Sequence, residues 1–447
     1  MAQKKRKINE LKKLKENYDI IIWIVKNKKD DLDLEKEDKN IEIENKILSI
    51  YNNFYSNLNK VDDFFKLNKK ILEKEEESKK NNIDKLIKKN KIKENENEII
   101  LWLTKEQFKD FHKNNRDKKI IWQWEVVLPK SMLIYFHSLF EHFLSKILIL
   151  IYNNSEEQLQ ESDIKFSFLE LKNFNSIEDA KKYIISNKIS NILYSPINKQ
   201  IDILLNLLWI YKDYKECFPI NSLIEISLRR NLFTHEDWIV NDIYINKCNE
   251  FWIENKFKKW KKIVFEENYF TNIYNTYYEF VIKIIFFSWI KLSNNEKKYE
   301  EAVWVFVNNR AFKMIQQWDL SLWLKIIEFV LTPKIIKKID EATYLMATLN
   351  KALIYKIKKE KNKVSSILKG IDWSAKSDLY KFAHYILNED RKQAWELMPK
   401  VVKKKRDKDY LSEYDLKTWP LFFEFKEQEI FKKNYKRIFK KDFILDF

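Results

Sequence analysis

The stretch PKSMLIYFHSLFEHFLSKILILIYNN, residues 129–154, decides the fold class of this chain. Its apolar residues recur at intervals of three and four, which is the spacing of a helix packed in a bundle. They are Leu133, Phe136, Leu139, Phe140, Phe143, Leu144, Ile147, Leu148 and Ile151. A helix with so broad an apolar face needs partner helices, so we expect an all-α fold.

Further helical patterns follow this stretch, at 177–186, 197–211, 220–233 and 264–291. Together they predict a helical bundle over residues 128–291. In INSLIEISLRRNLF (220–233), Ser222 and Glu225 match a capping box. Glu225 also stands one turn before Arg229, where it can form a supporting ion pair.

The residues before the bundle differ in composition. Residues 1–98 are rich in Lys, Glu and Asn, with apolar residues at helical spacing only at 47–65, and we expect a charged helical arm or linker. Residues 99–127 are expected to form a short connecting segment. Its end, IIWQWEVVLP (120–129), is predicted to be extended because of its β-branched residues and its proline.

Three runs after the bundle, within 295–447, are similar to the helix-turn-helix units of tetratricopeptide repeats. Each has an alanine on its first helix, Ala311, Ala352 or Ala383, and a polar turn soon after. This resemblance implies a region of helical-hairpin repeats. Generic helical hairpins show similar residues, and that alternative stays open.

Length, charge and cysteine content limit the class of protein. The 447 residues predict two or three domains. The net charge of +17 favours a polyanion or an anionic surface as partner, although lysine-rich solvated faces give the same excess. Cys217 and Cys248 are far apart and belong to no CxxC pattern, which predicts a reducing cytoplasm and no metal site. The longest apolar run, FVIKIIFFSWI (280–290), is short and contains Lys283, so no membrane span is expected.

The stretch RRNLFTHEDWIVND (229–242) contains the sequence Arg230-Asn231-x-x-x-His235. Placed at the end of an amphipathic helix in a helical bundle, this sequence resembles the R-x(4–6)-H motif of the HEPN superfamily of ribonucleases and toxins. The resemblance covers residues 128–291. It implies an RNA-cleaving site, usually completed by dimerisation, that needs neither metal nor cofactor.

The residue types suit that chemistry. A histidine can take the proton from a ribose 2′-hydroxyl, and an arginine can hold the phosphate bidentately while charge develops on it. We therefore predict His235 as the general acid or base, Arg230 as the phosphate-binding cation and Asn231 as the orienting residue. Arg229, Asp237 and Glu141, the last on the long helix, are the predicted supporting residues.

Structural interpretations compete with this site. A histidine after a helix is often a cap or a buried hydrogen-bonding group, and Arg229 and Arg230 can be a solvated face paired with Glu225 and Glu236. On a continuous helix Arg230 and His235 differ by about 140° in direction. They converge only where the helix ends or bends before His235.

Two function hypotheses follow from the sequence. The first is a metal-independent endoribonuclease, a toxin or defence effector that acts on RNA as a homodimer. The second is a non-catalytic helical scaffold that binds protein or peptide through its C-terminal repeats, or RNA. Among classes not expected are nucleotide-driven enzymes, because no glycine-rich phosphate loop occurs.

Glycine and tryptophan are present in abnormal numbers. The chain has one glycine and 15 tryptophans, whereas glycine normally makes up about 7% of residues. Trp209, Trp238, Trp318 and Trp373 stand where glycine is physically apt. We hypothesise that the source organism reads UGA as glycine and that these codons are written here as tryptophan. The alternative is a truly tryptophan-rich protein.

Overall fold

The computed structural model describes residues 31–94, 99–155, 166, 172–255, 257–263, 265–266, 268–293, 303, 306–307, 310, 319–337, 339–403 and 410–444. The chain divides into two compact units, residues 1–42 and 43–447. All the candidate site residues lie in the second unit. The first predicted repeat lies partly outside the described residues, and Trp318 lies wholly outside them.

The predicted all-α class is confirmed. In the described part of the chain the only strands are β1 (Lys91–Glu94) and β2 (Ile99–Leu101), which form one antiparallel pair. The helices are α2 (Asp31–Asn90), α3 (Lys105–Asn154), α6 (Ile177–Leu193), α7 (Ile197–Leu207), α8 (Tyr211–Tyr214), η1 (Lys215–Cys217), α9 (Ile220–His235), α10 (Asp242–Glu250), α11 (Tyr269–Leu292), α13 (Leu320–Val330), α14 (Pro333–Ile336), α15 (Glu341–Ile357), α16 (Lys361–Lys369), α17 (Asp378–Leu387), α18 (Arg391–Val401), α19 (Glu413–Thr418), η2 (Pro420–Phe422), α20 (Phe423–Lys426) and α21 (Glu429–Phe439).

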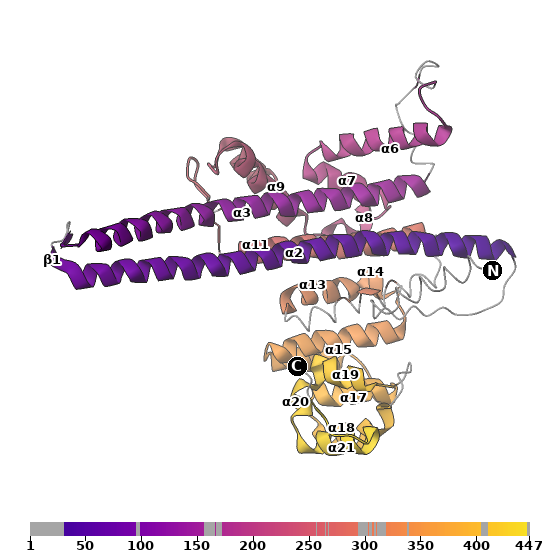
Figure 1. The fold of residues 1–447 in the computed structure, drawn as a ribbon. Coiled ribbons are helices and arrows are strands. Elements are labelled where there is room, and N and C mark those ends of the chain that lie inside the picture. The colour runs from indigo at the N-terminus through magenta and orange to yellow at the C-terminus, as the bar shows by residue number, and fades with distance from the viewer. Residues whose placement is uncertain are drawn as a thin grey trace, which may run out of the picture. The chain divides into compact units, whose positions relative to one another are not determined.

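Helices α2 and α3 run alongside one another and are joined by the β1–β2 hairpin (Figure 1). An ion pair of 3.3 Å between Lys79 and Asp117 links them near the hairpin, and the rings of Phe54 and Phe143 pack together nearer the core. The helical spacing at 47–65 becomes a buried face: Ile47, Tyr51, Phe54, Leu58, Val61 and Phe65 are all buried.

The extended conformation predicted for residues 120–129 is wrong. Helix α3 begins at a capping box of Thr104 and Gln107 and continues through this stretch, with Pro129 inside it. An internal proline removes one helical hydrogen bond and costs about 3 kcal/mol. The pairing with α2 and the apolar packing of the residues after Pro129 offset that cost, and neither is visible in the local sequence.

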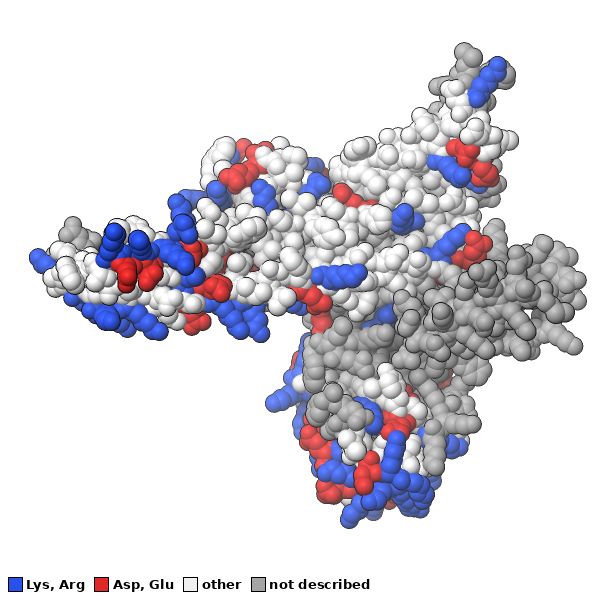
Figure 2. Space-filling model, viewed as in Figure 1, with Lys and Arg blue, Asp and Glu red and all other residues white. Residues whose placement is uncertain are grey.

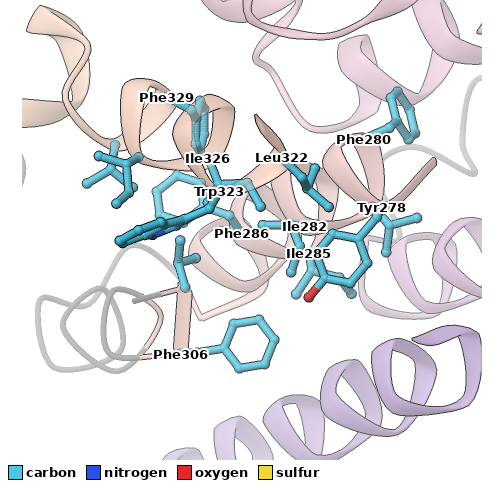
Figure 3. Close-up of a cluster of buried hydrophobic side chains, with 14 of the residues drawn as sticks. Tyr278, Phe280, Ile282, Ile285, Phe286, Phe306, Leu322, Trp323, Ile326 and Phe329 are labelled. Atoms are coloured by element: carbon cyan, nitrogen blue, oxygen red, sulfur yellow. The ribbon is translucent and has the colours of Figure 1, made fainter. Parts of the chain in front are cut away.

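Helix α11 is the centre of the core, because residues on every side of it are buried. It packs against α3, α9 and α13. Figure 3 shows Phe286 of α11 beside Trp323 and Ile326 of α13, and the ring of Phe286 also packs on Phe329. On its α2 side the hydroxyls of Tyr278 and Tyr51 are hydrogen-bonded at 2.7 Å. A helix that is apolar on all sides has to be surrounded by other helices.

The residues after the bundle form helical hairpins. Helix α15 packs against α16 and α17 against α18, and α15 also contacts α17. Ala352 and Ala383 are buried on the first helix of each hairpin. The hairpins lie where the sequence pattern places them, whereas the relation to tetratricopeptide repeats stays a prediction, as do the boundaries at 98, 127 and 291.

Helix α3 is long and apolar. By length and composition alone it is apolar enough to cross a bilayer, although we expect no such span from the sequence. Half of its most apolar 18-residue window is buried inside the fold. The core helix of a bundle has the same composition, because neighbouring helices replace water around it.

Candidate functional site

The predicted motif lies on α9, which begins at Ile220. The predicted capping box is wrong: the cap is Pro219, and no side chain caps this end of the helix. The helix begins two residues before Ser222, so the Ser222 side chain is already inside the first turn. The predicted pair of Glu225 and Arg229 is confirmed as an ion pair one turn apart.

Arg229 is a buried structural residue. Its guanidinium lies 4.0 Å from the ring centroid of Tyr269 and 4.9 Å from that of Phe257. The Tyr269 hydroxyl donates to the second carboxylate oxygen of Glu225 at 3.1 Å. Burial raises the pKa of the Glu225 carboxyl, and the Arg229 charge opposes the rise. Arg229 therefore fixes α9 against α11 and is not a solvated basic residue.

Arg230 faces a different neighbour. It is half-buried, and its Nη1 donates to the side-chain oxygen of Asn231 at 3.1 Å. Its Nε is buried and has no hydrogen-bond partner among the described residues. The guanidinium also helps to lower the pKa of Glu141 on α3. The predicted arginine and its predicted supporting carboxylate thus interact, and the described residues leave part of the guanidinium unpaired.

Glu141 belongs to a polar cluster of His137, Glu141, Arg230 and Tyr277, drawn from α3, α9 and α11. His137 is buried; its Nδ1 lies 2.9 Å from the Tyr277 hydroxyl and its Nε2 lies 3.4 Å from Glu141 Oε1. The hydrogen bond from His137, with smaller help from Arg230, holds the pKa of the Glu141 carboxyl below its ordinary value. In the sequence, the only indication of this contact is that His137 and Glu141 are one turn apart on an apolar helix.

His235 lies apart from this cluster. It is exposed at the end of α9, which is helical from Ile220 up to and including His235. The ending before His235 that convergence needs is therefore absent. Five helical steps turn the chain by about 140° relative to Arg230. Within one chain the two side chains leave the helix on different faces.

The turn after α9 is left-handed at both Asp237 and Trp238, with φ of 45° and 71°. Asp237 is exposed and pairs with Lys262 at 3.0 Å, so it supports the turn. The indole of Trp238 packs edge-to-face on Phe233 and Phe265, at centroid distances of 4.9 and 5.7 Å. These contacts fix the loop that follows the motif.

The hollow beside α9 is not lined by motif residues, and the described residues contain no group of metal ligands. A hollow of about 520 Å³ lies at the other end of α9, between Asp202, Lys215 and Asn221, and no motif residue lines it. In the described part of the chain no three His, Cys, Asp or Glu residues are grouped to hold a metal ion. On the face shown in Figure 2, basic and acidic side chains are mixed near β1 and over the C-terminal hairpins.

No protein-family model matches the chain, and neither does any curated protein or any solved structure.

Proposed function

We propose that the chain is a metal-independent endoribonuclease of HEPN type, a toxin or defence effector that acts on RNA in the cytoplasm. The observation that supports this proposal is the position of Arg230. Neighbouring Arg229 anchors its helix, its charge helps to lower the pKa of the Glu141 carboxyl, and its hydrogen-bonding capacity is only partly used. A fixed, incompletely paired guanidinium is what phosphate binding requires.

In the proposed reaction His235 takes the proton from a ribose 2′-hydroxyl. The 2′-oxygen then attacks the adjacent phosphorus, and Arg230 stabilises the charge on the phosphorane oxygens. The bond to the 5′-oxygen breaks, and that oxygen takes a proton from an imidazolium. The products are a 2′,3′-cyclic phosphate and a 5′-hydroxyl. Asn231 orients Arg230 through the hydrogen bond between their side chains.

The proposed enzyme is a homodimer. Because Arg230 and His235 leave α9 on different faces, one chain does not present both to the same phosphate. A two-fold interface places residue i of one protomer against residue j of its partner, and each site then combines Arg230 of one protomer with His235 of the other.

The test is cleavage of a defined RNA by purified protein in EDTA, with the new ends identified. Wild-type protein is expected to leave 2′,3′-cyclic phosphates, and His235→Ala to lose cleavage while it retains RNA binding. His112→Ala is the matched control, since His112 is exposed on α3 and its described ring contacts are with neighbouring Phe108 and Phe111. Intact RNA with folded, dimeric wild-type protein would reject the proposal.

The second candidate function is a non-catalytic scaffold, favoured by the contact between the hairpins α15/α16 and α17/α18. Stacked helical hairpins present an extended surface that suits a peptide or protein partner. On this reading wild-type protein binds RNA or a peptide, and the His235→Ala and Arg230→Ala variants bind as the wild type does.

A further inference from the structure

The left-handed backbone of this protein is concentrated at tryptophan. Eight non-glycine residues in the described part of the chain have positive φ, and four of them are tryptophans: Trp209 (58°), Trp238 (71°), Trp252 (53°) and Trp260 (65°). Tryptophan is about one residue in thirty of the chain, so eight positions should include fewer than one. The single glycine, Gly370, has a φ of −71° and does not use this conformation.

Left-handed backbone suits tryptophan poorly. In this region the Cβ atom approaches a backbone carbonyl oxygen, and residues that adopt it regularly are glycine and, less often, asparagine or aspartate. A bulky side chain at positive φ is a genuine outlier. Four such outliers of one residue type require a common cause.

Two of the four positions have the hydrogen bonds of a helix end that ordinarily carries glycine. Trp209 follows α7, and the next N–H, of Ile210, donates to the Leu205 carbonyl at 3.0 Å. Trp252 follows α10, and the N–H of Ile253 donates to the Cys248 carbonyl at 2.8 Å. This bond, which spans six residues around a left-handed one, defines the Schellman motif, whose left-handed residue is usually glycine.

The side chains at three of the positions gain little from burial. Trp209, Trp252 and Trp260 are 72%, 92% and 71% exposed. Lysine ammonium groups lie over two of the rings, Lys291 over Trp209 and Lys259 over Trp260. Trp238 is the exception, because its indole packs on Phe233 and Phe265.

Other tryptophans are well built into the fold. Trp373 is buried, donates from its indole nitrogen to the Leu368 carbonyl at 2.8 Å and stacks on His384. The expectation that glycine suits position 373 is therefore wrong, because a turn-like sequence there places its side chain in the core. Trp323 is fully buried, and Trp395 stacks on Phe425 at 3.8 Å. None of these three has positive φ.

We propose that the native protein has glycine at positions 209, 238, 252 and 260 and tryptophan at 323, 373 and 395. The written tryptophans at the first four are UGA codons that the source organism reads as glycine. This inference rests on backbone conformation and is independent of the proposed ribonuclease activity. With glycine at position 238, the loop after His235 has no indole, and Trp323, Trp373 and Trp395 are unchanged.

The decisive experiment reads the codons of the gene and the masses of the matching peptides from source cells. UGA codons and glycine masses are expected at the four left-handed positions, with UGG and tryptophan at positions 323, 373 and 395. A UGG codon at any of the four overturns the proposal for that position. A UGA codon at position 323, 373 or 395 overturns the rule that positive φ distinguishes glycine positions from tryptophan positions.

A folding experiment tests the physical argument separately. The expected result is a higher melting temperature for the combined variant Trp209→Gly, Trp252→Gly and Trp260→Gly than for the written sequence. Trp323→Gly is the matched control and should lower the melting temperature, since it empties a core site. A lower melting temperature for the triple variant would mean that these indoles stabilise the fold and that the argument from φ fails.

Discussion

Mixed dimers of Arg230→Ala and His235→Ala protomers provide the sharpest test of the proposed site. In each homodimer both sites lack one essential group, and loss of a general base or acid alone costs about 10²–10⁴-fold in rate. In the mixed dimer the intact Arg230 and the intact His235 belong to different protomers. If each site combines the two chains, one site is complete and the other lacks both groups, so about half of the wild-type activity per dimer returns.

The prediction depends on the angle between the two residues. Five steps along α9 separate Arg230 from His235 by about 140°, and the helix is continuous across them. The assay coexpresses the variants with different affinity tags, isolates the mixed dimer in two steps and measures RNA cleavage in EDTA. Mixed dimers as inactive as both homodimers, beside active wild-type protein, would refute the reasoning and place Arg230 and His235 in a site within one chain.

Further predictions concern the contacts that hold the site. Arg229→Ala should lower the free energy of unfolding in urea by about 3–5 kcal/mol, because it leaves a buried carboxylate unpaired; Lys262→Ala, which breaks an exposed pair, should change it by less than about 1 kcal/mol. The pKa of the Glu141 carboxyl is lower in the folded chain than in the unfolded chain. The ionised carboxylate therefore adds to the free energy of unfolding above the ordinary carboxyl range, and this stabilisation is lost as pH falls through the lowered pKa. Glu141→Gln should therefore destabilise more at neutral pH than in acid, and an equal loss at both would contradict the argument that the ionised Glu141 carboxylate stabilises the fold. Tyr51→Phe should cost about 1–3 kcal/mol by orphaning the buried Tyr278 hydroxyl, and adding Tyr278→Phe should recover part of it in thermal unfolding.

The candidate site was only partly predictable. Glu225 and Arg229 are one turn apart, so their pairing follows from helix geometry and is confirmed. The contacts of Arg229 with the rings of Tyr269 and Phe257 depend on a distant helix and loop. The hydrogen bond between His137 and Tyr277 likewise depends on a distant helix, because Tyr277 is on α11. The assignment of catalytic roles stays a proposal.

The sequence by itself determined the helical class and the positions of the main helices, because a three-to-four spacing of apolar residues is a local property that a helix converts directly into a buried face. It also pointed to abnormal glycine and tryptophan usage. Tertiary structure decided that α3 continues through Pro129, that Arg230 acts on the charge of Glu141 and that His235 is exposed on another face. It also separated the left-handed tryptophans from the core ones, such as Trp238 from Trp373. These outcomes depend on contacts between segments far apart in the chain, and local spacing contains no information about such contacts.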